Sequence, residues 1–329
     1  MSGLATAVVG VGRLGREHAR ILAELPGSRL VGVHDADPGT GERVARERDT
    51  RHFGSLDDLL SEAEAVVVAV PTADHHPVAR RALEAGCHVL VEKPFAATLD
   101  EADDLIRRAE ARDLELRVGH VERFNDAVRA STPHLERPRF IESLRLAPFQ
   151  PRGTDVTVVL DLMIHDIDLV LGLVESPLGS LHAVGTPVLT DSVDIANARL
   201  VFEDGTVAEI TASRVSEERT RTLRVFQATG YLRLDLAAGR GEFLRRRNGR
   251  PGASSLGPDR ATSLEDVVER VPLHGDGREP LKLELEAFLG AVRGEASRVV
   301  SARDGRAALE IAHRISREID QFSAGTPAG

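Results

Sequence analysis

Residues 4–25 read LATAVVGVGRLGREHARILAEL and place three patterns in direct succession: a strand, a tight turn and a helix. The opening LATAVVG is the short, apolar run of a buried strand, and RLGREHARILAEL has the apolar spacing of an amphipathic helix. Between and within them, Gly10, Gly12 and Gly15 form a G-x-G-x-x-G arrangement. Glycines at this spacing permit a tight turn and let a pyrophosphate approach the N–H groups that open the helix. The stretch therefore predicts the start of a dinucleotide-binding α/β domain.

The alternation of strand and helix patterns continues to about residue 120. Further strand candidates are RLVGVH, AVVVAV, CHVLV and LELRVG, and longer amphipathic segments separate them. Strands that alternate with helices over such lengths indicate a parallel sheet with helices on both faces. We therefore predict a doubly wound Rossmann domain over residues 1–122.

Asp35 ends the second predicted strand, about 20 residues beyond Gly15, where such domains place the acid that binds the adenosine ribose. Its carboxylate can accept both ribose hydroxyls and would repel the 2′-phosphate of NADP. The segment HDADPGTG offers no arginine to compensate before Arg43. This pattern favours NAD as the cofactor. The alternative is that Asp35 is a turn residue before Asp37-Pro38.

Bulk composition excludes several classes of protein. A formal net charge of −10 argues against a general nucleic-acid binder, because such a protein needs a basic field. The longest apolar runs, such as AVVVAV, are far shorter than the roughly 20 residues that cross a bilayer. No secretion signal is apparent at the amino terminus, and a single cysteine, Cys87, excludes an internal disulfide. We expect a cytoplasmic protein with neither a membrane nor a nucleic-acid partner.

The second half has the patterns of a different domain. YLRLDL at 231–236 alternates apolar and polar residues as a half-exposed strand does, and Asp204-Gly205 predicts a hairpin turn. Helical patterns return over 281–293 and 303–320, and 248–262 is predicted to be a loop. We predict an α+β domain over residues 123–329 with C-terminal helices and a large, mostly antiparallel, open-faced sheet. The three leucines of YLRLDL would give that face an apolar surface, so we expect a homo-oligomer, a dimer or a tetramer.

One predicted helix, VVLDLMIHDIDLVLGLV at 158–174, is apolar around most of its circumference yet carries ionisable residues. Asp161, His165 and Asp168 occupy positions i, i+4 and i+7 and should share one face. Asp161 can orient the His165 imidazole as a general base needs. A core histidine with nearby acids is an alternative. A metal site is a weaker one, because no His or Cys cluster supports it, so no metal is predicted.

Lys93 lies in VLVEKPF at 89–95 and is one of two lysines among 42 basic residues, the other being Lys282. A lysine can lose or share a proton, whereas an arginine stays charged. The segment follows the fifth predicted strand, at the sheet edge where ligands bind, and Pro94 restricts Lys93 to extended conformations. Lys93 is therefore a candidate catalytic cation, unless arginine is absent here only because it does not fit.

Three segments, GVGRLGREHA, PTADHHPVARRALEAGCHVLVEKP and DLMIHDID, together resemble the glucose-fructose oxidoreductase, inositol dehydrogenase and MocA family over most of the chain. In that family the lysine of the E-K-P motif and the Asp and His of the later helix are catalytic, which carries over to Lys93, Asp161 and His165. Thr72 replaces the asparagine of the family's Pro-Asn-x-x-His segment. The cofactor contacts that the resemblance implies are Gly10, Gly12, Arg13, Leu14, Asp35, Thr72, His75 and Glu92.

The segments GHVERFN at 119–125 and RGTDVTVVLDLMIHDIDL at 152–169 are most similar to family members that oxidise the 3-hydroxyl of a UDP-N-acetylhexosamine. The resemblance implies substrate contacts from Arg123, Asn125 and Arg152, and the two arginines suit a diphosphate. Surface ion pairs are the alternative for both arginines. The runner-up function is a dehydrogenase of free inositol or a related sugar. A regulator that senses the dinucleotide without turnover is less consistent with Lys93, Asp161 and His165 occurring together.

Overall fold

The computed structural model describes residues 3–150, 156–247 and 264–324, which form two compact units. Unit 1 comprises Met1–Phe124 and Glu279–Glu310, and unit 2 comprises Asn125–Arg278 and Ile311–Gly329. The sequence predicted one boundary, after residue 122, and so differs from this division over 279–310. The predicted loop at 248–262 lies outside the described residues.

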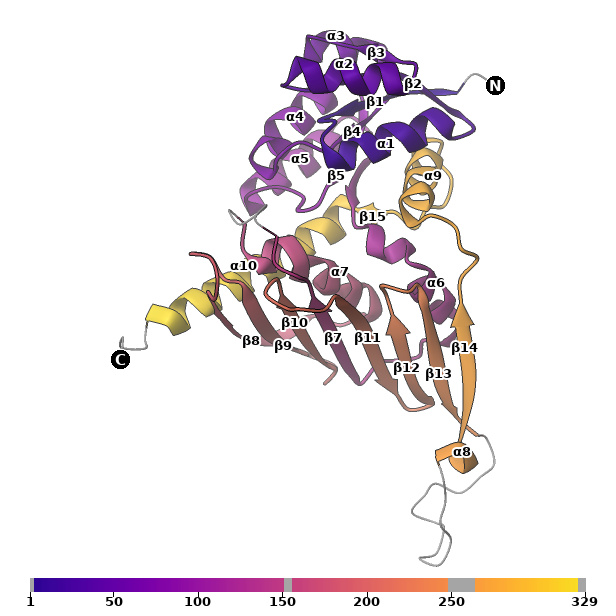
Figure 1. Cartoon of the computed structure of the whole chain (residues 1–329), viewed down its shortest axis with the longest axis vertical. Helices are drawn as coiled ribbons and strands as arrows, with labels where there is room; N and C mark the ends of the chain where they lie inside the picture. The colour runs from indigo at the N-terminus through magenta and orange to yellow at the C-terminus, as the bar shows by residue number, and fades with distance from the viewer. Residues whose placement is uncertain (1–2, 151–155, 248–263, 325–329) are drawn as a thin grey trace, which may run out of the picture. The chain divides into compact units, whose positions relative to one another are not determined.

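Unit 1 contains a seven-stranded sheet in the order β15-β6-β5-β4-β1-β2-β3. Its neighbouring strands are parallel except at the antiparallel β15 edge. The strands are β1 Leu4–Val9, β2 Ser28–His34, β3 Arg51–His52, β4 Ala65–Val68, β5 His88–Glu92, β6 Leu116–Gly119 and β15 Val300–Ser301. The helices are α1 Arg13–Glu24, α2 Pro38–Glu47, α3 Leu56–Glu62, α4 Thr72–Glu84, α5 Leu99–Glu110, the 3₁₀ turn η1 Val121–Phe124 and α9 Pro280–Val292, and α10 Ala302–Ala324 continues into unit 2. The predicted Rossmann fold is confirmed (Figure 1).

The strand order reverses at β1, which lies between β2 and β4. The chain proceeds from β1 to β2 and β3 on one side, and then from β4 to β5 and β6 on the other. Ligands of doubly wound sheets bind at the carboxyl ends of the strands beside such a reversal. A ligand is therefore expected at the segments that follow β1, β2, β4 and β5.

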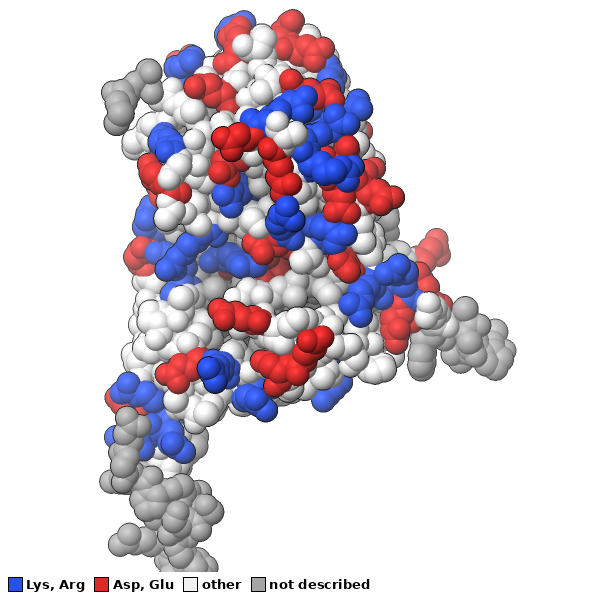
Figure 2. Space-filling view, turned by 180° about the vertical axis from the view of Figure 1, so that it is seen from behind, with Lys and Arg blue, Asp and Glu red and all other residues white. Residues whose placement is uncertain are grey.

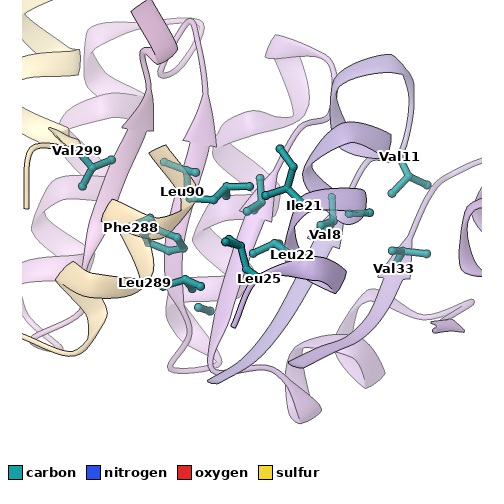
Figure 3. Packing of buried hydrophobic residues seen from close by; sticks show 14 of the residues in the cluster. Val8, Val11, Ile21, Leu22, Leu25, Val33, Leu90, Phe288, Leu289 and Val299 are labelled. Atoms are coloured by element: carbon teal, nitrogen blue, oxygen red, sulfur yellow. The ribbon is translucent and has the colours of Figure 1, made fainter. Parts of the chain in front are cut away.

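The C-terminal segment returns to unit 1 because α9 completes its core. Figure 3 shows Phe288 and Leu289 of α9 beside Leu22 and Leu25 of the α1 segment. Phe288 is 1% exposed, and Leu22 is equally buried. Without α9 these side chains of the α1 segment would face water, which explains why residues 279–310 belong with the first unit.

Unit 2 contains an eight-stranded sheet in the order β14-β13-β12-β11-β7-β10-β9-β8, in which only β7 and β10 pair in parallel. The strands are β7 Phe140–Leu146, β8 Leu178–Thr186, β9 Ile195–Phe202, β10 Val207–Ser213, β11 Thr220–Gln227, β12 Gly230–Asp235, β13 Arg240–Arg246 and β14 Val268–His274. The helical segments are α6 Asp126–Ser131, η2 Thr132–His134, the π-helical turn η3 Val159–Met163, α7 Ile164–Leu173 and α8 Leu264–Val267. The predicted hairpin at Asp204-Gly205 joins β9 to β10, with Gly205 at a φ of 82°. The predicted antiparallel α+β domain is thus confirmed.

The leucines of YLRLDL do not form an exposed apolar face, so that part of the prediction was wrong. Leu232, Leu234 and Leu236 are at most 4% exposed, because this side of the sheet is covered within the chain. The opposite side carries cross-strand ion pairs such as Glu142 with Arg224, and it contains a hollow of about 590 Å³ lined by threonines and charged residues. The open face is therefore polar, and self-association remains a prediction.

Charged side chains of both signs are intermixed on the surface that Figure 2 shows. Within the described residues, no helix is both long and apolar enough to cross a membrane. Cys87 is fully buried beside β5, and burial raises the pKa of its thiol to about 11.

Candidate functional site

The glycine turn between β1 and α1 has the geometry that its sequence predicts. Gly10 has a φ of 82°, and its N–H donates to His34 O at 2.8 Å. A Cβ on Gly10 would lie 2.7 Å from Ala69 O, and a Cβ on Gly15 would lie 1.8 Å from Gly10 O. Both positions therefore need glycine so that the turn can pack between β4 and α1.

Gly12 needs a different explanation, because a Cβ there would meet no described protein atom within 4 Å. Gly12 is the N-cap of α1, and no side chain caps the N–H groups of the first turn. Arg13 and Leu14 follow in that turn, and Leu14 is 49% exposed. This open space at a helix N-terminus fits the pyrophosphate of a dinucleotide.

Asp35 is anchored beside this turn. Its Oδ2 accepts a hydrogen bond from Val11 N–H at 2.7 Å, and its Oδ1 accepts one from Asp37 N–H at 2.9 Å. The carboxylate is thus fixed between the glycine turn and the end of β2. Each oxygen keeps lone-pair capacity for a further donor, as a ribose diol requires.

Glu92 joins three structural elements at the end of β5. Its Oε1 lies 2.7 Å from His18 Nε2 on α1, and its Oε2 accepts from Lys93 N–H at 3.1 Å. Burial raises the pKa of Glu92, but the hydrogen bond and Coulombic effect of His18, together with the charge and backbone N–H of Lys93, outweigh it and leave the pKa below its ordinary value. Sequence reasoning missed His18, although it lies within the quoted segment GREHA. The Lys93–Pro94 peptide bond is cis.

His75 joins two loops at the same edge of the sheet. Its Nδ1 lies 2.8 Å from Pro94 O, and its Nε2 lies 2.9 Å from Val70 O. Burial lowers the pKa of this imidazole, although both carbonyls favour the charged form. These contacts place His75 where it holds the Lys93–Pro94 segment, and its expected contact with the cofactor stays a prediction.

Unit 1 thus brings most of its predicted site residues to the carboxyl ends of its strands. Gly12 follows β1, Asp35 follows β2, Thr72 opens α4 after β4, and Lys93 follows β5. Arg123 lies in η1, beyond β6. This is the edge at which the strand order predicts a ligand.

In unit 2, the predicted helix that carries Asp161 and His165 is not a continuous α-helix. Asp161 lies in the π-helical turn Val159–Met163, and His165 lies in the first turn of α7. A π turn contains more residues than an α turn, and a spacing of four residues through it still returns to nearly the same face, so the shared face of Asp161 and His165 stays a prediction. Such turns often occur at functional sites. Both side chains are half-buried, whereas Asp168 is 1% exposed.

A buried ion pair that the sequence did not predict fixes α7 to the sheet. Arg145 of β7 donates to both carboxylate oxygens of Asp166, from Nε at 2.6 Å and from Nη2 at 3.0 Å. Ser143 Oγ donates to the same carboxylate at 2.9 Å. Arg145 and Asp166 are 2% and 1% exposed. Because Asp166 directly follows His165, this pair holds the segment that carries the candidate base.

Two further predicted substrate contacts are Asn125 and Arg152. Asn125 is the N-cap of α6, where its Oδ1 accepts from Ala127 N–H and its Nδ2 donates to Leu236 O at 2.8 Å. These bonds give Asn125 a structural role within unit 2, and a substrate contact from it stays a prediction. Arg152 lies outside the described residues. Among the residues that are described, no group of three His, Cys, Asp or Glu side chains could hold a metal ion.

Comparisons with known proteins agree with this geometry. Residues 4–120 match the model of an oxidoreductase family with an NAD-binding Rossmann fold, and residues 137–233 match the GFO/IDH/MocA C-terminal domain. The chain is 37% identical over 319 residues to UDP-N-acetylglucosamine 3-dehydrogenase of Acidithiobacillus ferrooxidans, which covers 96% of this chain and 97% of that protein.

Two further similarities extend over nearly the whole chain. A solved structure of the A. ferrooxidans UDP-N-acetylglucosamine 3-dehydrogenase aligns with a TM-score of 0.88 at 35% identity and covers 98% of this chain and 99% of that one. Inositol 2-dehydrogenase 1 of Saccharopolyspora erythraea is 31% identical and covers 97% of this chain and 94% of its own length.

Proposed function

Because the chain belongs to the Gfo/Idh/MocA oxidoreductase family, we propose that it oxidises the 3-hydroxyl of a UDP-N-acetylhexosamine to a ketone with NAD as the hydride acceptor. The observation that carries the substrate class is the 37% identity to a UDP-N-acetylglucosamine 3-dehydrogenase across 97% of that protein. The similarity spans both units, so it includes the domain in which the substrate contacts of this chain are expected.

The preference for NAD rests on Asp35. Two backbone N–H groups already orient its carboxylate toward the glycine turn. In the proposed complex the remaining lone pairs accept the adenosine ribose hydroxyls, and the open space at Gly12 admits the pyrophosphate. A 2′-phosphate would meet the fixed negative charge of Asp35, so NADP is disfavoured.

The proposed chemistry assigns one task to each candidate residue. The nicotinamide, when bound, supplies an acceptor for the hydride that leaves the carbinol carbon. His165 takes the proton of the hydroxyl, and Asp161 orients the imidazole and stabilises its charged form. Lys93 donates a hydrogen bond to the oxygen of the same hydroxyl while that oxygen becomes the carbonyl oxygen of the product. Glu92 holds the backbone of Lys93 during this change.

A dehydrogenase of free inositol or a related sugar is the second candidate, because an inositol 2-dehydrogenase is 31% identical over most of this chain. The two functions are separated by measuring kcat/KM for NAD reduction with UDP-N-acetylglucosamine and with myo-inositol. A nucleotide-sugar product that has lost two hydrogen atoms by mass spectrometry supports the first proposal. A higher kcat/KM for myo-inositol would replace it with the second.

We also propose that the protein is cytoplasmic and forms a homo-oligomer, as composition and the open sheet predict. The polar character of that sheet face means that an interface there would depend on cross-strand charges such as Glu142 and Arg224. Sedimentation of the wild-type protein at low and high salt tests this point, because screening weakens such contacts.

A further inference from the structure

A buried side chain of α1 reaches the strand end that carries Lys93. His18 is 0% exposed, and its Nε2 lies 2.7 Å from Glu92 Oε1. The other oxygen of the same carboxylate accepts from the backbone N–H of Lys93 at 3.1 Å. One carboxylate therefore links the helix of the glycine turn to the proposed catalytic lysine.

The hydrogen bond between His18 and Glu92 has a defined direction. The carboxylate of Glu92 is ionised in this environment and can only accept, so His18 Nε2 carries the proton that is shared. The other ring nitrogen, Nδ1, is buried and makes no hydrogen bond to any described residue. A second proton on Nδ1 would leave a buried N–H without an acceptor. The geometry therefore places the shared proton on Nε2, and only that side of the ring acts on Glu92.

The Glu92 carboxylate has little room to move if this bond is kept. On its other side lies Gly119 of β6, where an added Cβ would be 3.2 Å from Glu92 Cδ and 3.3 Å from Glu92 Oε2. The carboxylate is thus packed between β6, α1 and the start of the Lys93 segment. If His18 lost its donor, Glu92 would have to rotate toward another donor or draw in water, and the bond to Lys93 N–H would change with it.

We propose that His18 is a positioning residue for Lys93: its Nε2–H bond holds Glu92, and Glu92 holds the backbone from which the Lys93 side chain extends. This inference rests on the proposed function, because it assigns His18 to the same reaction. It predicts that residue 18 affects turnover more than cofactor affinity. Among the expected cofactor contacts, His18 holds only Glu92, and those of Gly12 and Asp35 do not depend on it.

Two amide substitutions of His18 distinguish the roles of its two ring nitrogens. His18→Gln places an amide nitrogen where Nε2 lies, and His18→Asn places one where Nδ1 lies and finds no acceptor. We expect His18→Gln to keep kcat within about threefold of wild type. We expect His18→Asn to lose roughly tenfold to a hundredfold in kcat, the scale on which a small misplacement of a reacting group acts. The Kd of NADH, measured by fluorescence, should stay within about twofold in both variants, since the contacts of Gly12 and Asp35 remain.

The rarity of lysine permits a direct measurement that needs no substrate. In a Lys282→Arg background, reductive methylation with ¹³C-formaldehyde labels Lys93 and the terminal amine, and the methyl signal of Lys93 reports its surroundings by NMR. We expect this signal to keep its chemical shift in His18→Gln and to move in His18→Asn. If Lys93→Met retained activity, the proposed role of Lys93 would fail, while this signal would still test the link between residues 18 and 93.

Three outcomes overturn the proposal. One is a folded His18→Asn protein with wild-type kcat and an unmoved Lys93 signal. Another is an equal loss in His18→Gln and His18→Asn, because the Nε2 donor would then not be the decisive group. If His18→Asn does not fold, the double variant His18→Leu/Glu92→Leu removes both buried polar groups together and should fold. An unmoved Lys93 signal in that variant is the third contradicting result.

Discussion

Arg145→Met tests the buried ion pair that fixes α7 beneath the candidate base. The substitution keeps an apolar chain of similar length but removes the two hydrogen bonds, 2.6 and 3.0 Å long, that the guanidinium donates to Asp166. Asp166 is 1% exposed and would keep the hydrogen bond that Ser143 Oγ donates to it at 2.9 Å. The variant therefore leaves a buried carboxylate that is no longer neutralised by a partner.

The expected loss is about 3–5 kcal/mol in the free energy of unfolding, the usual cost of removing one partner of a buried ion pair. Two hydrogen bonds to a charged group, at roughly 1.5–3 kcal/mol each, lead to a similar figure. The double variant Arg145→Met/Asp166→Val removes the charge as well and should return to within about 1 kcal/mol of wild type. Ser143 would then still have Thr222 O as an acceptor, at 3.5 Å.

The chain provides its own probe for this measurement, because it has no tryptophan and a single tyrosine. Tyr231 lies in β12 of unit 2 and stacks on Phe226 with ring centroids 5.2 Å apart. Tyrosine fluorescence during urea denaturation therefore follows unit 2, whereas far-UV circular dichroism follows both units. The two signals together separate the unfolding of unit 2 from that of unit 1.

A matched control lies on the opposite face of the same sheet. Arg224 pairs with Glu142 of β7 at 3.0 Å, but the two side chains are 48% and 40% exposed, so Arg224→Met should cost less than about 1 kcal/mol. The reasoning would be refuted by an equal loss in Arg145→Met and Arg224→Met. It would also be refuted if the Arg145→Met/Asp166→Val protein were as unstable as Arg145→Met alone.

Three further predictions concern single side chains. Lys93→Arg and Lys93→Met should each lower kcat by roughly 10²-fold, the scale of a positioned acid-base group, and near-normal turnover of a folded Lys93→Arg protein would contradict the assigned role. Asp35→Ser should raise kcat/KM for NADP relative to NAD, and a wild-type preference for NADP would count against the ribose contact. Cys87 should resist alkylation at pH 8 until the protein unfolds, because the thiol is buried and its pKa is about 11. Since the folded state holds that proton more tightly, stability measured by urea denaturation should fall as pH rises from about 9 toward 11; rapid alkylation of folded protein would disprove this.

The features that the sequence predicted best depend on local chemistry. The turn at Gly10 and the anchored carboxylate of Asp35 follow from residues close together in the chain and from a topology that many sequences share. Lys93 stands out as a candidate because its residue type is rare in this chain, and its position after β5 agrees with the sequence prediction. In each case the relevant signal lies in a short segment.

The features that it did not predict depend on pairing between distant segments. Arg145 meets Asp166 only because β7 lies under α7, and no pattern within either segment specifies the partner. The π turn at Asp161 adds a residue to a helix whose apolar spacing looks regular. Likewise, the alternation of leucines around Leu234 shows that they share one side of the sheet, but it does not show whether the rest of the chain covers that side. Which strand pairs with which, and which side of a sheet the helices cover, are determined only in the assembled fold.

The return of α9 to the first unit has a consequence for synthesis of the protein. Residues 125–278 are inserted between two parts of unit 1. The ribosome must therefore synthesise all of them before Phe288 can cover Leu22 and Leu25. Until then the growing amino-terminal portion exposes an apolar surface to the ribosome exit and to chaperones. A fragment that stops near residue 124 would keep this surface, and aggregation of such a truncated product is the expected result.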